Sequence, residues 1–275
     1  MRNKTLWLLA GGIMILGAGA LTLAQFLPED VAQRAQWEEF LSTAEIVGEE
    51  QMTGAKSVTN PWKLTLEKSG VRRVGLWKNV SGRPRGYIDN WKFELAAYRL
   101  DKLLGLNMVP PTVERNYNGP GSFQLWMDSW MTLEKKMDDN IKIPSYKIFH
   151  WNRALYLQRF FDNLIANDDR HQNNYLITQD WRMYLIDHSR SFRIYGDFVK
   201  KLQYTDKRRG GPMEMLEIPR ILLNKIKALD FEAVRGAVGD YLTEDEIKAV
   251  LTRRDLILKE MDRICKKNGE ANVLY

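Results

Sequence analysis

The densest group of polar side chains in the 275-residue chain is Asn-Asp-Asp-Arg-His-Gln-Asn-Asn at positions 167–174. Within this group, Asp169 and Asn174 are five residues apart. An aspartate that orients an acceptor hydroxyl, followed five residues later by an asparagine that binds a divalent cation, is typical of a phosphoryl-transfer catalytic loop. We therefore predict that Asp169 is catalytic and that Asn174 is a metal ligand.

A second predicted metal ligand, Asp187, directly follows the apolar residues 183–186. A carboxylate at the end of a buried strand is held by rigid backbone, and hard divalent cations prefer oxygen ligands. Asp187 is therefore expected to bind Mg²⁺ or Mn²⁺ together with Asn174.

Phosphoryl transfer also requires a cation on the nucleotide phosphates. Lys78 lies in the expected strand 71–80, and Glu94 lies in the expected helix that follows. Kinases use a strand lysine held by a helix carboxylate to place the phosphates of ATP. Lys78 and Glu94 are therefore predicted nucleotide-binding residues, and the small residues at 52–57 give a weaker indication of a phosphate-binding loop.

The pattern of apolar residues predicts an α+β fold with two lobes. Alternating and β-branched residues indicate strands at 46–80, 108–115 and 122–127, with a turn at 118–121. The expected helices are 28–44, 90–104, 146–166, 219–237 and 243–267, with a short hairpin at 175–186. The expected order is a hydrophobic segment 1–27, a linker helix 28–45, and a kinase-like domain 46–275 that divides into a strand-rich lobe with one helix (about 46–127) and a mainly helical lobe (about 128–275).

Four separated segments, in the expected order, resemble the atypical kinases of the secretory pathway, the Golgi casein kinase-like group. Residues 93–105 form a glutamate-bearing helix with a leucine-rich end, and residues 109–112 read Val-Pro-Pro-Thr. Residues 161–171 resemble the catalytic-loop segment of this group and are also similar to the loops of HipA-type and phosphatidylinositol 3-/4-kinase-like proteins. Residues 185–187 look like the metal-binding strand, so the resemblance covers roughly 46–195.

The resemblance implies a role for each predicted site residue. Lys78 would contact the phosphates of ATP, and Glu94 would pair with Lys78 or with the metal. Asp169 would be the catalytic aspartate, and Asn174 and Asp187 would hold Mg²⁺ or Mn²⁺. The chain departs from the Golgi kinases in two respects. They are rich in disulfides, whereas this chain has one cysteine, and its last segment, 196–275, matches no motif that would identify the acceptor.

The amino-terminal residues predict association with a membrane. Residues 6–27 carry no charge and follow Arg2 and Lys4, and they are long enough for a helix of ~20 residues that spans a bilayer. The positive-inside rule then places the catalytic domain outside the cytoplasm in a single-pass protein. If the segment is instead a cleaved signal peptide, the protein is secreted.

Composition limits the possible partners. The chain is 44% hydrophobic and 28% charged, a globular mixture that excludes a disordered or multi-span membrane protein. Its net charge of +6 is too small to indicate a nucleic-acid partner. The expected acceptor is a hydroxyl of a protein or glycan, with a lipid of the phosphoinositide type as an alternative.

Other function classes remain open at this stage. A catalytically silent kinase-like module would bind nucleotide or act as a scaffold at the membrane, and a metal-dependent hydrolase or nuclease would need further carboxylates near Asp169. The basic groups at 200–201 and 207–209 are expected to be solvated loop charge, or else a site for an anionic acceptor or lipid head group. Asp168 and His171 are expected to shape the loop rather than to catalyse.

Overall fold

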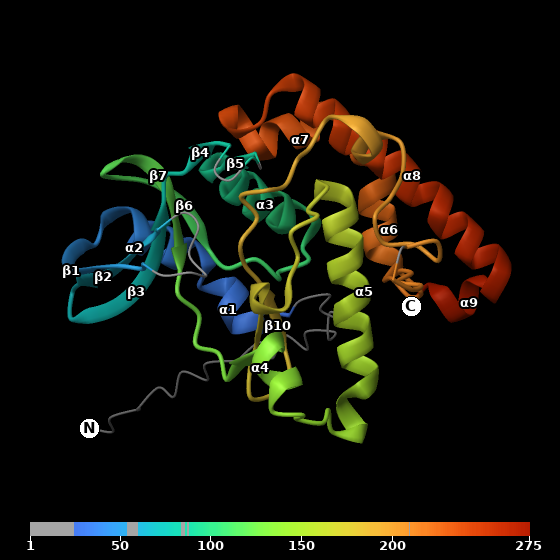
Figure 1. Ribbon diagram of the computed structural model, residues 1–275, viewed down its shortest axis with the longest axis horizontal. Coiled ribbons are helices and arrows are strands. Elements are labelled where there is room, and N and C mark those ends of the chain that lie inside the picture. The colour runs from blue at the N-terminus through green and yellow to red at the C-terminus, as the bar shows by residue number, and fades with distance from the viewer. Residues whose placement is uncertain (1–24, 54–59, 84–85, 87, 209) are drawn as a thin grey trace, which may run out of the picture.

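The computed structural model describes residues 25–53, 60–83, 86, 88–208 and 210–275. The fold is mixed α/β: a five-stranded antiparallel sheet stands beside a group of helices (Figure 1). The strands, in spatial order, are β1 (Glu45–Gln51), β2 (Trp62–Lys68), β3 (Val71–Lys78), β7 (Gly119–Leu125) and β6 (Thr112–Tyr117). In β2 the alternation of buried Leu64 and Leu66 with the partly exposed Thr65 and Glu67 turns one face of the sheet toward a core.

One face of the sheet is covered by a helix from the start of the described chain. The helix expected at 28–44 is divided into α1 (Pro28–Ala32) and α2 (Arg34–Thr43). Phe40 and Leu41 of α2 are buried in a cluster with apolar residues of β2, β3 and β7. Val31 and Ala35 of the same segment are exposed. Packing against the sheet therefore buries Phe40 and Leu41 and leaves these two residues in solvent.

The helix that carries Glu94 has the predicted ends. Helix α3 (Trp91–Leu104) begins where the side chain of Asn90 accepts a hydrogen bond from the backbone N–H of Lys92. It ends at Gly105, whose φ of 72° is readily adopted by glycine. It follows a two-stranded ladder of β4 (Ser81–Gly82) and β5 (Asp89–Asn90). Because α3 packs against both the sheet and helices of the second half, it is buried over most of its length.

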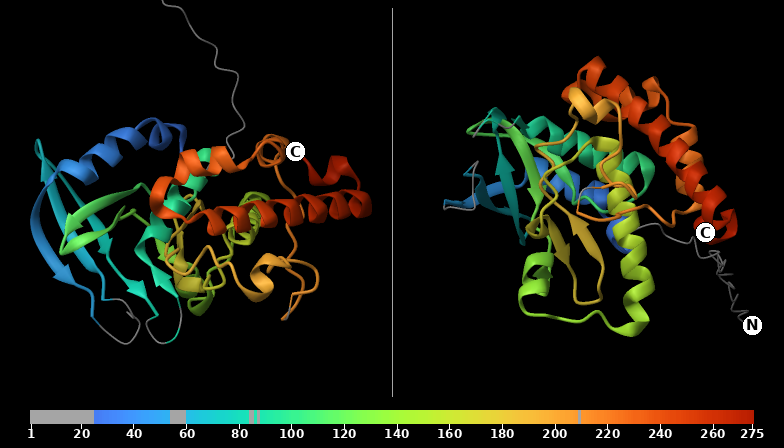
Figure 2. Two further views of the ribbon diagram at one scale, coloured as in Figure 1. Left: turned by 90° about the horizontal axis from the view of Figure 1, so that it is seen from above. Right: turned by 45° about the vertical axis from the view of Figure 1, so that its right-hand side comes forward.

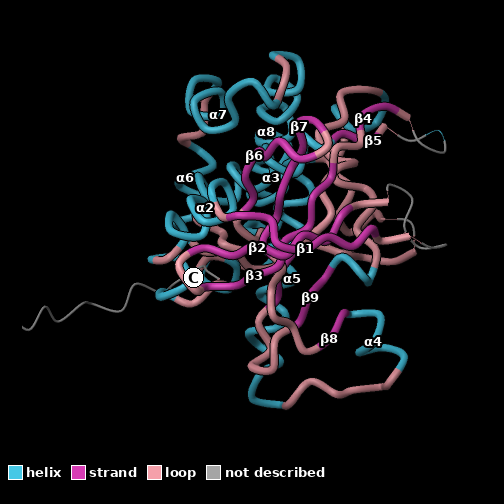
Figure 3. The backbone as a smooth tube through the Cα atoms, turned by 90° about the vertical axis from the view of Figure 1, so that its left-hand side faces the viewer, coloured by secondary structure: helices cyan, strands magenta, loops and turns pink. Residues whose placement is uncertain are grey.

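The remaining elements form the helical half of the molecule. They are β8 (Met131–Thr132), α4 (Leu133–Asp138), α5 (Ile148–Ile165), β9 (Tyr175–Ile177), β10 (Met183–Leu185), α6 (Arg220–Lys227), α7 (Phe231–Val238), α8 (Glu244–Asn268) and α9 (Glu270–Val273), with short 3₁₀ turns between them. Strands β8, β9 and β10 pair in a small sheet, and β8 and β9 lie with α4 below the main sheet (Figure 3). The long helices α5 and α8 pack against each other, as the two views of Figure 2 show.

In this half, one predicted helix boundary is confirmed and another is wrong. The helix expected from 243 begins there, and Thr243 and Glu246 form a capping box at the start of α8. The single helix expected at 219–237 is instead two helices, because Asp230 accepts a hydrogen bond from the backbone N–H of Ala233 and so caps a new helix. The apolar periodicity did not show this boundary, because it does not distinguish a capping aspartate from any other polar residue in the segment.

Two sequence predictions fall on residues without a description. Most of the predicted membrane segment 6–27 lies in residues 1–24, and the loop 52–57 lies largely in residues 54–59. Among the residues that the structure describes, no helix is both long and apolar enough to cross a bilayer.

A buried carboxyl on α3 gives the protein a pH-dependent stability that can be measured. The side chain of Asp101 is fully buried, and one of its oxygens accepts a hydrogen bond of 2.9 Å from the backbone N–H of Met108. Burial raises the pKa of Asp101 to about 7. The folded protein therefore retains this proton at pH values where the unfolded chain has lost it, so the associated stability declines from about pH 4 to about pH 7.

We expect Asp101→Asn to remove this decline. The variant should gain on the order of 1–3 kcal/mol relative to the parent protein between pH 5 and pH 8, measured by urea unfolding. Asp255→Asn, an exposed change on α8, is the matched control. Parallel stability curves for Asp101→Asn and the parent protein would contradict the prediction.

Candidate functional site

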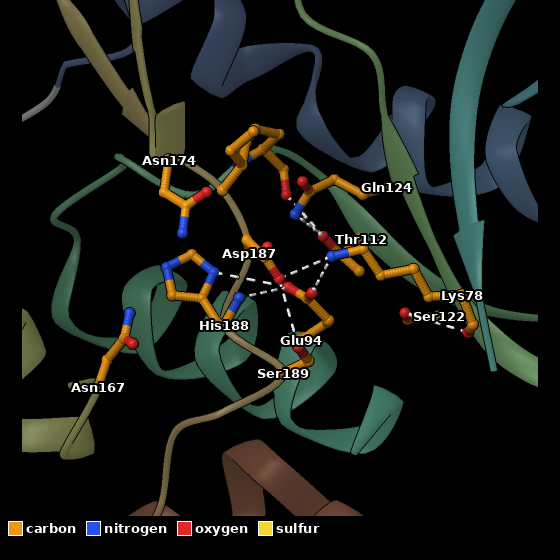
Figure 4. Close-up of polar contacts among 12 residues, drawn as sticks. Lys78, Glu94, Thr112, Ser122, Gln124, Asn167, Asn174, Asp187, His188 and Ser189 are labelled. Atoms are coloured by element: carbon orange, nitrogen blue, oxygen red, sulfur yellow. Dashed lines mark hydrogen bonds and ion pairs between the residues drawn. The ribbon is translucent and has the colours of Figure 1, made fainter. Parts of the chain in front are cut away.

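Three residues that are distant in the sequence meet through the amine of Lys78. The Nζ atom of Lys78, at the end of β3, lies 2.7 Å from Oε1 of Glu94 on α3 and 2.9 Å from Oδ1 of Asp187, just after β10 (Figure 4). The Lys78 side chain is only 11% exposed and that of Glu94 only 3%. The structure therefore brings together the predicted nucleotide-binding pair and one predicted metal ligand.

The charges of these three groups stabilise one another. Burial alone would lower the pKa of Lys78, but the carboxylates of Asp187 and Glu94 raise it above its usual value. Burial alone would raise the pKa values of both carboxyls, but the Lys78 ammonium lowers them below their ordinary values. The site thus keeps a protonated lysine between two ionised carboxylates at neutral pH.

The backbone aims Asp187 toward Lys78. Asp187 has a φ of 62°, in the left-handed region that aspartate and asparagine enter more readily than most other residues. Ser189 donates a hydrogen bond of 3.3 Å to the same carboxylate oxygen that Lys78 contacts. A residue held in a rarely used conformation between well-ordered elements is a common feature of functional sites.

His188 is part of this site, although the sequence analysis assigned it no role there. Its backbone N–H donates a hydrogen bond of 2.9 Å to Oε2 of Glu94 and so fixes the carboxylate that holds Lys78. Its ring is fully buried, and burial, with Arg170 nearby, lowers the pKa of His188 so that the ring is neutral at pH 7. The Nδ1 atom lies 3.6 Å from Glu94, beyond hydrogen-bond distance.

The loop after α5 brings the other two predicted residues together. Helix α5 ends at Ala166 in the left-handed conformation, and Asn167 then accepts a hydrogen bond from the backbone N–H of Asp169. The side-chain amide of Asn174 donates 3.0 Å to the carbonyl of Asp169. In Figure 4 the Asn174 side chain lies to the left of Asp187 and the amine of Lys78 to its right. The five-residue spacing thus corresponds to a direct contact within one compact loop.

A buried ion pair connects this loop to Asp187. Arg170 binds both oxygens of Asp162 on α5 at 3.0 Å, and both side chains are fully buried. Its guanidinium also donates 2.6 Å to the carbonyl of Ile186, next to Asp187, and 3.1 Å to that of Asn174. Arg170 therefore sets the position of the loop relative to the strand end that carries Asp187.

The two neighbouring aspartates of the loop have different partners. Asp169 is 3.1 Å from Nη1 of Arg190, and Nε of the same arginine lies 3.1 Å from the buried Asp89 of β5. Asp168 instead pairs with Arg193 at 2.6 Å. Burial raises the pKa of Asp168, although Arg193 opposes that effect. Each aspartate thus pairs with an arginine, and the division in which Asp168 shapes the loop and Asp169 is catalytic stays a prediction.

The residues present fit a divalent cation that is also held by a nucleotide. Within the described part of the chain, no three His, Cys, Asp or Glu side chains cluster as a self-sufficient metal site. The two predicted ligands, Asp187 and Asn174, would offer oxygen atoms rather than a histidine nitrogen or a cysteine sulfur. Mg²⁺ is usually held by one or two carboxylates together with water and substrate phosphates rather than by a complete protein cage. The donor set thus suits Mg²⁺ or Mn²⁺ bound to nucleotide phosphates.

Two partly exposed tryptophans lie in the connection from β7 to the helical half. Trp126 and Trp130 are each 44% exposed. The Trp126 backbone N–H bonds to Val74 of β3, and the Trp130 ring packs against Trp181 at 5.7 Å. His171 accepts a hydrogen bond from the backbone N–H of Asn173, which is the loop-bracing role expected for it.

Comparison with solved structures identifies a fold relative. The chain is similar to hydra Fam20, solved with sugar, with a TM-score of 0.64 and 17% sequence identity over 92% of this chain and 95% of that chain. Fam20 is a member of the secretory-pathway kinase group that the sequence motifs resemble. At this level of identity the likeness shows a kinase-like fold. No protein-family model and no curated protein matches the sequence.

Proposed function

We propose that this protein is a metal-dependent phosphotransferase that moves the γ-phosphoryl group of ATP to a hydroxyl of a protein or glycan. The observation that carries the proposal is the buried contact of Lys78 with Glu94 and Asp187. The catalytic-loop pair of Asp169 and Asn174 supports it, because the buried Arg170 joins that loop to the strand end that carries Asp187.

Each group has a distinct task in this proposal. Lys78 carries the positive charge that the nucleotide phosphates need, and Glu94 and His188 keep its amine in place. Asp187 and Asn174 would hold the Mg²⁺ or Mn²⁺ ion, which supplies charge neutralisation on the phosphates when bound. Asp169 would orient the acceptor hydroxyl and accept its proton. Catalysis would therefore rest on positioning and electrostatic stabilisation.

The acceptor class has some support from the fold relative. Hydra Fam20 was solved with a sugar, so a glycan hydroxyl is the first acceptor to test. A protein hydroxyl is the second, and a phosphoinositide-type lipid is the alternative. A catalytically silent module is disfavoured, because a scaffold has no need of Lys78, Asp169, Asn174 and Asp187 together.

We further propose that residues 6–27 anchor the protein in a membrane, with the catalytic domain outside the cytoplasm. The support is the uncharged stretch after Arg2 and Lys4. The compartment must then supply ATP, which a eukaryotic secretory lumen would do.

The direct test is transfer of label from γ-labelled ATP. The full-length protein in detergent is incubated with Mn²⁺ or Mg²⁺ and an envelope or secretory-membrane extract from its own source, and the labelled product is identified. Metal-dependent labelling of a glycan or protein supports the proposal. Metal-dependent nucleotide binding without any transfer would instead favour the silent module, and labelling of lipid alone would favour the lipid kinase.

Arg190 provides a more specific prediction for this reaction. Its guanidinium contacts Asp169 and Asp89 at 3.1 Å each, so it links the proposed catalytic aspartate to the segment that precedes α3. Lysine keeps the charge but cannot reproduce two directed contacts. We expect Arg190→Lys to lower kcat about 10- to 100-fold, with little change in KM for ATP, because Asp169 loses its fixed orientation.

A steady-state assay at several ATP concentrations measures this effect. Arg182→Lys, a matched change at an arginine of the β9–β10 hairpin, is the control. An unchanged kcat for Arg190→Lys, or an equal loss in the control, would show that Arg190 does not position Asp169.

A further inference from the structure

A strongly basic pocket lies away from the proposed catalytic residues, between the segment 200–208 and the second half of α8. The cavity measures about 650 Å³. Its charged lining residues are Lys200, Lys201, Lys207, Arg208, Lys259 and Arg263, with the carboxylates Asp206 and Glu260. The sequence indicated the basic groups at 200–201 and 207–209. Lys259 and Arg263 join them only because α8 packs beside the segment 200–208. We call this cavity the basic pocket.

The positive charge of the basic pocket is only partly neutralised. Arg263 is within 3.3 Å of Asp206 and 2.8 Å of Glu260, so it uses both carboxylates of the lining. Among the described residues, the ammonium groups of Lys207 and Lys259 have no hydrogen-bond or ion-pair partner. An excess of unpaired cations around one cavity creates a local potential that attracts anions.

Gln203, which also lines the basic pocket, has an unpaired neutral donor that rotation of its side chain would present to a bound anion. Nε2 of Gln203 is buried and has no hydrogen-bond partner in the described structure. The backbone at Gln203 is fixed, because its N–H donates 2.9 Å to Oδ1 of the buried Asn163. Buried donors without an acceptor are costly, so this group is expected to take up an acceptor, either water or a ligand.

The guanidinium of Arg208 is a further donor in the lining, and it is already held in position. The Arg208 guanidinium lies 4.5 Å from the centre of the Tyr204 ring and donates to the carbonyl of Gln203. This stacking orients a planar group with further N–H donors before any ligand arrives. The basic pocket therefore combines a preoriented guanidinium, two unpaired ammonium groups and an unpaired amide.

We propose that the basic pocket binds a phosphate or sulfate ester carried by a saccharide. The oxygens of such an ester accept several charge-assisted hydrogen bonds, which matches the donors available. A volume of about 650 Å³ is typical of small-molecule sites and accommodates a sugar with its ester. The donors line one cavity rather than a flat face, which favours a compact ligand over a lipid surface.

The role of this site rests on the proposed function: the ester would be the anionic part of a glycan acceptor, held while another hydroxyl of the glycan receives the phosphoryl group. The lining of the basic pocket contains none of the proposed catalytic or metal-binding residues, so an acceptor would have to extend from the basic pocket to Asp169. Binding of the ester itself requires neither ATP nor a metal ion, so it can be tested whether or not the protein is a transferase.

The test is calorimetric titration of the full-length protein in detergent, without ATP or metal, with glucose 6-phosphate, glucose 6-sulfate and glucose. We expect both esters to bind and glucose not to bind. The double variant Lys207→Glu, Lys259→Glu should weaken ester binding at least 10-fold. The double variant Lys142→Glu, Lys267→Glu changes the net charge equally at exposed positions elsewhere and should alter binding less than 2-fold.

Gln203→Leu separates the amide from the charges. The variant should weaken ester binding about 3- to 10-fold while its melting temperature stays equal or rises, because an unpaired buried donor is removed. Ester binding that is unchanged in Gln203→Leu and in the Lys207, Lys259 double variant would overturn the proposal.

A vesicle assay distinguishes the lipid alternative. Phosphatidylcholine vesicles with and without phosphatidylserine are sedimented with the protein. If the anionic vesicles bind through Lys207 and Lys259 while the sugar esters do not bind, the basic pocket is a lipid contact and the proposal is wrong. If the protein binds the esters but has no transfer activity, the proposed ester site is supported. The proposed function, and with it the role of the ester as part of an acceptor, would then be rejected.

Discussion

Replacement of Asp187 by asparagine is expected to abolish metal-dependent nucleotide binding while leaving the protein folded. Among the residues that the structure describes, Asp187 is the only carboxylate of the helical half that contacts Lys78, and it is one of two proposed metal ligands. An amide keeps the shape but loses the negative charge that a divalent cation requires. We expect the affinity for ATP with Mn²⁺ to fall at least about 100-fold.

The local geometry makes asparagine a suitable replacement. Asp187 has a φ of 62°, which asparagine tolerates better than alanine, and an amide oxygen can still accept from Lys78. Lys78 also keeps its contact with Glu94, so no charge is left buried without a partner. A melting temperature close to that of the parent protein, without ligand, would show that the loss of binding is not a loss of folding.

Thermal-shift titration with ATP, with and without Mn²⁺, measures the effect. Asp180→Asn, in the exposed turn of the same hairpin, is the matched control and should keep the full metal-dependent shift. If Asp187→Asn retains that shift, Asp187 does not hold the metal, and the proposed nucleotide site must be abandoned.

Local sequence signals predicted the parts of the site that a single element determines. The capping asparagine at 90 and the glycine at 105 fixed the ends of α3 and so the place of Glu94 on it. The spacing of Asp169 and Asn174 needed only one compact loop, which the structure contains. Lys78 could be placed because β-branched and aromatic residues indicated a strand at 71–80, and the structure contains it as β3 (Val71–Lys78).

Contacts between distant segments were not predictable in the same way. His188 and Arg190 act on Glu94 and Asp169 through the folded chain, and no spacing in the sequence links them. Arg170 was recognised only as part of a motif, although its buried pair with Asp162 joins the catalytic loop to Ile186. The partners of these residues come from other elements, so the contacts exist only after the two halves have packed.

The helix boundary at Asp230 and the basic pocket were not predicted from the sequence, for related reasons. Apolar periodicity suggested one helix at 219–237, because it measures burial and does not register the competing cap at Asp230. The basic pocket could not be inferred from residues 200–208 alone, since Lys259 and Arg263 reach it from α8. Tertiary packing, rather than local preference, decides these features.

Replacement of Asp169 by asparagine should leave nucleotide binding intact and remove transfer. Asp169 makes no contact with Lys78, and its carboxylate contacts Arg190 instead. Its proposed work is done on the acceptor hydroxyl, where an amide can accept a hydrogen bond but cannot take the proton. We expect kcat to fall about 10²- to 10⁴-fold, the usual contribution of a positioned acid or base, with the affinity for ATP changed less than about 3-fold.

The neighbouring aspartate provides the matched control for this prediction. Asp168 pairs with Arg193 at 2.6 Å and has its pKa raised by burial, so Asp168→Asn should perturb the loop and lower kcat only a few-fold. Turnover and ATP affinity are measured for both variants under the same conditions. Loss of turnover in Asp168→Asn with normal turnover in Asp169→Asn would identify Asp168, rather than Asp169, as the catalytic aspartate. Full turnover in both variants would mean that neither carboxylate accepts the proton. The proposal of a kinase-like reaction at this loop would then have to be abandoned.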